Sequence, residues 1–496
     1  MVNIINSIYF MFLILNISLN SSNSGILNCQ NEINLKIKGP GIQYIICNEN
    51  IEGYSFKGIY PSKIIINDNE YTQDLSNKIE LDFDINNISM KWDNSISDLS
   101  FMFYNVENII EVDLTKTILS TNANLEKMFS NCKTLTSVKF LNFDHSTYQT
   151  GNFRVKLDYM FSNCTLLAFI NINNIYSHVS LSMDNMFNGC NSIDLINISN
   201  IEFDSKTISM NNMFHGCTSI NSMNIFNLKI QRSNHNLKNM FSNCTFLGQL
   251  NIFDFQIDGS AVFLYMDNFF NNCTFFDQIN IFDFKIDGSP GYLQMDNFFN
   301  SCTFLNQINI SNFEFTVSPG FLYMNHFFNS CTFLNQVNIS NFEFNGNPGY
   351  LYMNHFFNSC TFLNQVNISN FKFIKSNNYL MMNNMFNFSS LTSVYFLNVD
   401  FSISNDQNSK VFSGVKNLNY IKFNSCNINE KYYSFLFSDD IPENIVYCIE
   451  EDNKLYELLS HKNCSLLDCT DNFKESQKKK LYLIVILVLT IVMIIL

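Results

Sequence analysis

The sequence predicts an α/β repeat solenoid, in which each coil supplies one short parallel strand and a short helical back segment and a cap closes either end. One observation is a recurring block, Met-Phe or Phe-Phe followed by x-x-Cys, that places cysteines 26 to 32 residues apart. Another is the apolar–polar–apolar alternation that follows each cysteine, which is typical of a half-buried strand. At 496 residues the chain also exceeds a usual single core, which favours a quasi-linear array.

The repeated block fixes the units. It recurs with Cys132, Cys164, Cys190, Cys217, Cys244, Cys273, Cys302, Cys331 and Cys360. The frame continues without cysteine at Met102-Phe103, Met385-Phe386 and Val411-Phe412. We therefore expect about twelve units over residues 93–426.

The strand of each unit follows the cysteine. In a typical unit we expect Leu305, Ile308 and Ile310 to point inward, because alternate residues of a strand share one face. The Asn or Asp that ends the pattern, such as Asn312, is expected to stack on its copies and bond the backbone of the turn.

The remainder of each unit predicts the back of the solenoid. Leu293, Phe298, Phe299 and Cys302 fall on one side at roughly helical spacing, which indicates a short helix or tight helical turns. Pro-Gly pairs such as Pro290-Gly291 are typical of the turn that leads into this segment.

The unit Met-Phe-x-x-Cys-x-x-Leu-x-x-Ile-x-Ile-x-Asn-Phe resembles the BspA-like leucine-rich-repeat surface proteins, and the resemblance covers roughly residues 99 to 426. It implies a leucine-rich-repeat-like fold and adhesion to extracellular proteins, to matrix or to other cells. Several steps between units are stretched to 29 residues, so the ligand does not follow from the resemblance.

Both ends of the chain carry apolar runs. Residues 1–24 read as a secretory signal peptide, with a buried N-terminal strand as the alternative. Residues 473–496 read as a spacer and a hydrophobic membrane anchor, either a single transmembrane helix or a glycolipid-anchor signal. Several Asn-x-Ser/Thr sequons agree with a secreted glycoprotein. We therefore expect a cell-surface location with an extracellular ectodomain.

The segments between these ends and the repeats are expected to be caps, since a solenoid otherwise exposes its cross-section. Residues 25–92 predict a β-rich N-terminal cap, and residues 427–472 a cysteine-containing C-terminal cap. In an oxidising compartment the candidate disulfide cysteines are Cys29 with Cys47, and Cys448, Cys464 and Cys469.

The composition argues against several functions. A net charge of −14 repels nucleic acid. No clustered nucleophile, acid and base is visible, so we expect no enzyme activity, no cofactor and no catalytic or metal site. Each cysteine of the repeat lies beside apolar residues, which favours a buried thiol over a disulfide between units or a zinc ligand.

The outward face of the strands is the candidate ligand-binding face. Its residues are uncharged: Asn224, Asn251, Asn280, Asn309, Gln249, Gln278 and Gln307, with Phe226, Phe253 and Phe282 on adjacent coils. A row of exposed aromatic rings usually marks an interface. Stacked amides also stabilise a sheet, which is the structural alternative.

These observations give two hypotheses. In the first, the chain is a surface adhesion or recognition protein that binds an extracellular protein or glycan through this face. In the second, it is a structural coat protein or a receptor ectodomain without catalytic activity.

Overall fold

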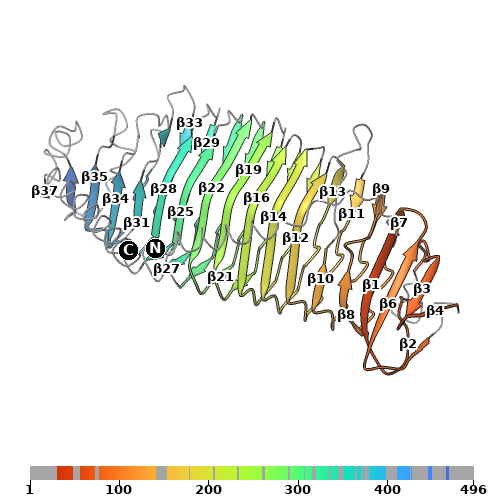
Figure 1. Ribbon diagram of the computed structural model, residues 1–496. Helices are drawn as coiled ribbons and strands as arrows, with labels where there is room; N and C mark the ends of the chain where they lie inside the picture. Colours follow the sequence, from red (N-terminus) through yellow and green to blue (C-terminus); the bar gives the residue numbers. More distant parts are fainter. Residues whose placement is uncertain are drawn as a thin grey trace, which may run out of the picture.

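The computed structural model describes residues 31–47, 56–72, 78–140, 154–177, 179–204, 207–231, 234–259, 263–288, 291–305, 308–315, 320–333, 337–344, 350–362, 366–369, 372–373, 379–397, 410–424, 426, 445–449 and 465–467. These residues form a long β-solenoid whose strands lie side by side along one axis (Figure 1). The predicted α/β class with helical back segments is wrong, because the described residues contain strands and turns and no helix.

The main sheet runs the length of the solenoid. From the C-terminal end its parallel strands are β37 (Ser465–Leu467), β36 (Val446–Ile449), β35 (Tyr420–Asn424), β34 (Ser393–Leu397), β31 (Val366–Ser369), β28 (Val337–Phe344), β25 (Ile308–Phe315), β22 (Ile279–Gly288), β19 (Leu250–Gly259), β16 (Ser222–Gln231), β14 (Leu195–Asp204), β12 (Phe169–Ser177), β10 (Ser137–Lys139) and β8 (Ile109–Asp113). The short strand β32 (Lys372–Phe373) also pairs with β28.

Antiparallel strands continue this sheet at its N-terminal end. In order from β8 they are β1 (Asn31–Lys38), β6 (Ile85–Trp92), β3 (Lys63–Ile66) and β4 (Asn69–Tyr71). A separate pair joins β2 (Gly41–Gln43) to β5 (Ile79–Leu81).

Two smaller parallel sheets form the other sides. The second sheet contains β7 (Ile96–Asp98), β9 (Leu119–Asn124), β11 (Arg154–Lys156), β13 (Ser180–Ser182), β15 (Ile208–Ser209), β17 (His235–Asn236), β20 (Phe263–Tyr265), β23 (Tyr292–Gln294), β26 (Phe321–Tyr323), β29 (Tyr350–Tyr352) and β33 (Tyr379–Met381). The third contains β18 (Thr245–Phe246), β21 (Thr274–Phe275), β24 (Thr303–Phe304), β27 (Thr332–Phe333) and β30 (Thr361–Phe362).

The back segment is not helical because its backbone bonds to the next coil. In the unit around Phe299, Asn297 and Ser301 both have positive φ, at 58° and 59°, which interrupts a right-handed helix. Alternate N–H groups then point along the solenoid axis: those of Met295, Asn297, Phe299 and Ser301 donate to the carbonyls of Tyr323, Asn325, Phe327 and Asn329. The apolar spacing that resembles a helix is therefore the spacing of a strand followed by a tight turn.

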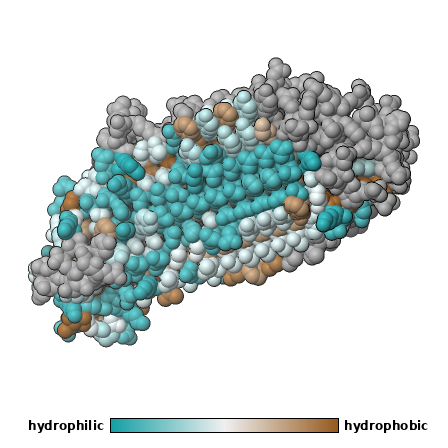
Figure 2. All heavy atoms as spheres, turned by 180° about the vertical axis from the view of Figure 1, so that it is seen from behind, coloured by the Kyte–Doolittle hydropathy of each residue, from teal (hydrophilic) through white to brown (hydrophobic). Residues whose placement is uncertain are grey.

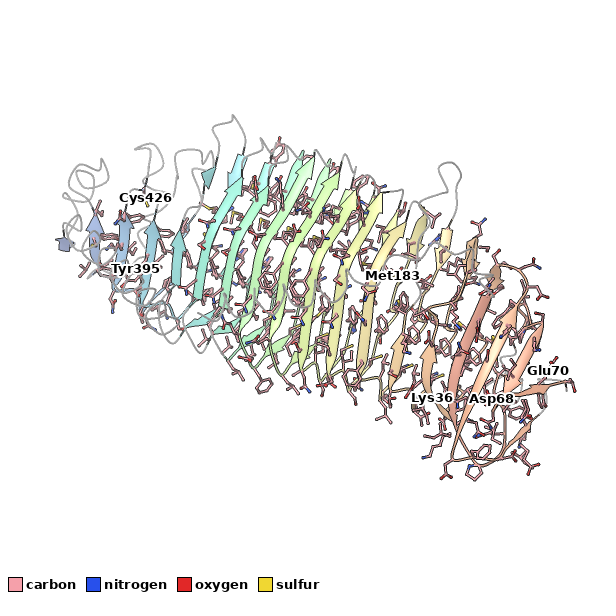
Figure 3. The ribbon with its side chains drawn as sticks, in the orientation of Figure 1. Lys36, Asp68, Glu70, Met183, Tyr395 and Cys426 are labelled. Carbon is pink, nitrogen blue, oxygen red and sulfur yellow. The ribbon has the colours of Figure 1, made fainter. Side chains whose placement is uncertain are left out.

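Inside the solenoid, the repeated blocks stack into columns. One phenylalanine from each block joins a continuous stack with ring centroids 4.9 to 5.5 Å apart, formed by Phe103, Phe129, Phe161, Phe187, Phe214, Phe241, Phe270, Phe299, Phe328, Phe357, Phe386 and Phe412. Side chains fill the interior along its length, and Met183 and Cys426 are both buried (Figure 3).

The strand prediction is correct at two positions, wrong at Leu305 and correct in its stacking at Asn312. Ile308 and Ile310 are buried as expected. Leu305 is only half-buried, because Phe304 in β24 takes the inward position and is 1% exposed. Asn312 stacks on its copies as expected: on the outside of the solenoid its amide donates to Asp283 Oδ1 at 2.8 Å, and its Oδ1 accepts from Asn341 at 2.8 Å.

We predict that Phe299→Ala lowers the free energy of unfolding by about 3–5 kcal/mol, because it opens a cavity in the phenylalanine stack. Urea denaturation of the full chain, followed by circular dichroism, measures the change. Phe276→Ala is the matched control; this ring is 49% exposed, so its loss should cost less than about 1 kcal/mol. Equal losses in the two variants would contradict a stacked core.

Candidate functional site

The outward face of the main sheet carries an amide ladder. Asn224 donates from Nδ2 to Asn197 Oδ1 at 3.2 Å, Asn251 to Asn224 at 3.0 Å, and Asn280 to Asn251 at 3.0 Å. Each of these side chains is half-buried, and Asn309 continues the row in register. The predicted asparagines therefore lie together on one face, bonded from coil to coil.

The predicted aromatic residues lie beside this ladder. Phe226 and Phe253 stack with centroids 5.5 Å apart and planes 1° from parallel, and both rings are half-buried. The backbone of Phe282 continues the register between Phe253 and Ser311, but its side chain lies outside the described residues. The structure thus brings two of the three rings together on the amide face.

The glutamines of the predicted face have different surroundings. Gln249 is exposed, and Gln278 donates from Nε2 to Asn280 Oδ1 at 2.9 Å. Gln307 lies outside the described residues. The amide face is therefore extended by a glutamine that helps to orient its neighbour.

A bend in the strands separates this uncharged half of the face from a charged half. The bend falls at residues with positive φ, including Asn227, Asp254 and Asp283, which the register leaves unpaired. Beyond it, Lys285 and Glu314 on adjacent coils form an ion pair of 3.8 Å, and both side chains are well exposed. Such a pair contributes little, so the amide ladder and the two rings set the character of the face.

The cysteines of the repeat are structural. Cys132 to Cys360 are buried thiols without disulfides, as the apolar surroundings predict. Each sulfur lies within hydrogen-bonding distance of a phenylalanine carbonyl in an earlier coil, as Cys302 Sγ does at 2.9 Å from Phe270 O. Burial raises the pKa of Cys190 and Cys217 well above the ordinary value, so these thiols stay protonated and unreactive.

Two of the five candidate disulfide cysteines, Cys47 and Cys448, lie in the described part of the chain. Cys448 is disulfide-bonded. Cys47 is buried, and this burial raises its pKa to about 11. Cys29, Cys464 and Cys469 lie outside the described residues, so the predicted pairings stay predictions.

A second outward feature was not predicted from the sequence. We call it the aromatic lattice, and it consists of two rows on the second sheet: Phe263, Tyr292, Phe321 and Tyr350, and beside them Tyr265, Tyr323 and Tyr352. The alternation in Phe263-Leu264-Tyr265 and Phe321-Leu322-Tyr323 is a strand signal, with each leucine buried. The aromatic lattice was missed from the sequence because this segment was interpreted as helical.

The described residues contain no group of three or more His, Cys, Asp or Glu side chains that could hold a metal ion. His326 and His355 stack with centroids 4.9 Å apart, and they occupy equivalent positions in successive coils. Burial, together with the neighbouring His355, lowers the pKa of His326. The two histidines therefore stack from coil to coil in the same way as the other side-chain columns.

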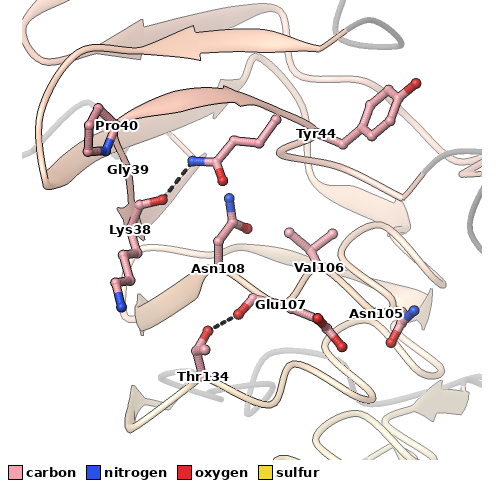
Figure 4. Close-up of a pocket in the computed structure, with 10 residues that line it drawn as sticks. Lys38, Gly39, Pro40, Tyr44, Asn105, Val106, Glu107, Asn108 and Thr134 are labelled. Carbon is pink, nitrogen blue, oxygen red and sulfur yellow. Dashed lines mark hydrogen bonds between the residues drawn. The ribbon is translucent and has the colours of Figure 1, made fainter.

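A shallow pocket of about 590 Å³ lies where the N-terminal strands meet the first coil (Figure 4). Lys38, Pro40, Tyr44 and Glu107 contribute to its walls. The amide atoms of Asn108 face this region but are themselves buried and have no hydrogen-bond partner. Surrounding atoms therefore cover this amide, so it is not presented to a ligand in the pocket.

Seen from behind the view of Figure 1, the solenoid is hydrophilic over a broad area (Figure 2). The turns supply a further asparagine ladder, in which Asn300, Asn329 and Asn358 each donate to the preceding copy at 2.7 to 2.9 Å. The three sides of the solenoid therefore differ in chemistry.

No family model matches the sequence, and no match is found among the curated proteins or the solved structures.

The second sheet places one histidine in the core. His235 lies in register between Ile208 and Leu264 and is 1% exposed, and both ring nitrogens lack hydrogen-bond partners. Burial lowers its pKa to about 4. An imidazole thus occupies a place that aliphatic residues fill in adjacent coils.

We predict that His235 destabilises the fold in acid. The folded-state pKa lies below the unfolded value, so stability is retained above about pH 6.5 and falls by about 3 kcal/mol as the pH drops to about 4. His235→Leu should remove this part of the loss. Urea denaturation at pH 7.5, 6, 5 and 4 compares the two proteins, and identical pH dependence would contradict the assignment.

Proposed function

We propose that this chain is a cell-surface adhesion or recognition protein that binds an extracellular protein or glycan through the outward face of the main sheet. The observation that carries the proposal is the amide ladder through Asn224 and Asn251 with the stacked Phe226 and Phe253 beside it. This combination offers hydrogen-bonding groups and apolar surface on one rigid support. Partly exposed aromatic rings are enriched at interfaces for that reason.

The geometry suits a large ligand better than a small one. The strands form a long, continuous sheet, and the candidate residues recur once per coil along it (Figure 1). A small molecule usually requires a concave pocket that covers most of its surface. A ligand that contacts several coils at once therefore fits this face best.

The surface location rests on segments outside the described residues. The proposed signal peptide (1–24) and membrane anchor (473–496) both fall there. Among the described residues, none forms a helix that is long and apolar enough to cross a membrane. Either form of the anchor, transmembrane helix or glycolipid, would leave the solenoid outside the cell. The resemblance to BspA-like surface proteins supports the same location from the sequence pattern.

One observation favours the structural alternative, a coat protein or a receptor ectodomain that uses the face only for stability. The amides of Asn224, Asn251 and Asn280 bond to one another, so part of their hydrogen-bonding capacity is already used. The amide hydrogens and lone pairs that remain are available to a ligand, because each amide has two donors and two acceptor sites.

We predict that replacing Phe226, Phe253 and Phe282 with Ser lowers binding of the full chain to cells or to immobilised matrix proteins by at least about tenfold, because partly buried aromatic rings dominate such interfaces. Saturation binding measures the effect, and the circular-dichroism melt checks that the fold is intact. Phe388→Ser, a 68% exposed ring in a turn outside the main sheet, is the control.

Two outcomes would contradict the proposal. Unchanged binding by a folded triple variant would reject this face as the binding site. Absence of saturable binding by the unaltered chain would favour the structural coat protein.

A further inference from the structure

The aromatic lattice of the second sheet is an ordered surface. Along the solenoid axis, ring centroids are 5.3 Å apart for Phe263 and Tyr292, 4.9 Å for Tyr292 and Phe321, and 4.9 Å for Phe321 and Tyr350. In the second row, Gln294 takes the place of a ring between Tyr265 and Tyr323, and Tyr323 and Tyr352 are 4.8 Å apart.

The two rows are also aligned with each other. Along each strand the centroids are 5.9 Å apart for Phe263 and Tyr265, 6.1 Å for Phe321 and Tyr323, and 6.2 Å for Tyr350 and Tyr352, with planes within 12° of parallel. The rings therefore share one orientation over four coils.

Part of each ring remains open to solvent. Carbon atoms in contact lie about 3.5–4.0 Å apart, so centroid spacings near 5 Å mean that neighbouring rings overlap with an offset. Tyr292, inside the first row, is 36% exposed. The lattice thus presents ring edges, the strips of ring face that the offset leaves uncovered, and phenol groups along one line.

Lys238, Asp267 and Asp296 border the lattice, so carboxylates outnumber cations there. Lys238 lies 4.4 Å from the centroid of the Tyr265 ring and forms a 3.0 Å ion pair with Asp267. Asp296 accepts a hydrogen bond from the backbone N–H of Asn325, and burial raises its pKa to about 6. No unpaired cation lies on the described part of this surface to attract an anionic polymer or an anionic membrane.

Backbone pairing excludes β-strand addition as a mode of binding at the lattice. The strands under the lattice pair with their neighbours on both sides, as β23 does with β20 and β26. A partner peptide therefore cannot add as another strand here, since that mode requires an open sheet edge.

We infer that the aromatic lattice is a second binding site, distinct from the main-sheet face, and that its ligand is a neutral, extended β-linked polysaccharide lying along the solenoid axis. The rings of the first row recur every 4.9 to 5.3 Å along the solenoid axis, and a linear polymer whose units repeat over a similar distance matches this spacing. Sugar rings present apolar C–H faces and hydroxyl groups together, and the phenols and ring faces of the lattice complement both. The surplus of carboxylates beside the lattice disfavours an anionic chain and is compatible with a neutral one.

The test measures binding of the full chain to cellohexaose and chitohexaose by isothermal titration calorimetry, with cellobiose and polygalacturonate as comparison ligands. We expect tighter binding to the hexasaccharides than to cellobiose, and no binding to polygalacturonate. Tyr292→Ser combined with Phe321→Ser should weaken binding by about tenfold or more, because two central rings are lost. Phe276→Ser, on another side of the solenoid, should leave it unchanged.

Several results would overturn the inference: no binding of either hexasaccharide, affinity independent of ligand length, or equal effects of the lattice variant and Phe276→Ser. Sedimentation that shows a dimer lost in the lattice variant would assign the surface to a second copy of the chain instead. The main-sheet variant Phe226→Ser with Phe253→Ser should retain oligosaccharide binding, so failure here is distinguishable from failure of the proposed adhesion site.

Discussion

Hydrogen bonding between successive coils is the constraint on which the rest of the structure depends. Turn residues such as Asn297 and Phe299 donate their backbone N–H groups to the next coil, so a single coil cannot satisfy its own backbone. This bonding fixes which residues lie over one another. A slip by one residue would turn the apolar side chains of every strand towards solvent, and the buried phenylalanine stack therefore selects one register.

The register that packs the inside also arranges the outside. Asn224 lies on Asn251 in the main sheet because the coils beneath them are aligned through Phe214 and Phe241. Several outward positions consequently become columns of one chemical kind: amides on the main sheet, aromatic rings on the second sheet, and asparagines at the turns. Repetition thus gives this chain several distinct surfaces without any change in its core.

The sequence alone is sufficient to predict the stacked columns, but it does not predict the structure of the back of the solenoid. Stacking of the blocks follows from counting residues, and the inward positions of Ile308 and Ile310 follow from alternation. The spacing of Phe298, Phe299 and Cys302 suits a helix equally well, and a helix is excluded only by the hydrogen bonds to the next coil and the positive φ angles of the turn. For the candidate site, Phe226 and Phe253 could be found because their segment was read as a strand, whereas Tyr292 was missed because its segment was read as helical.

In-register stacking can be measured most directly by disulfide formation between introduced cysteines. Asn224 and Asn251 are register partners, about 4.8 Å apart in a sheet, whereas Asn224 and Asn280 lie two coils apart, at roughly 9.6 Å. Mass spectrometry after mild oxidation should find a disulfide in Asn224→Cys with Asn251→Cys and none in Asn224→Cys with Asn280→Cys, since a disulfide spans at most about 7 Å between Cα atoms. Equal yields in the two variants, or a disulfide only in the second, would contradict the stacked solenoid.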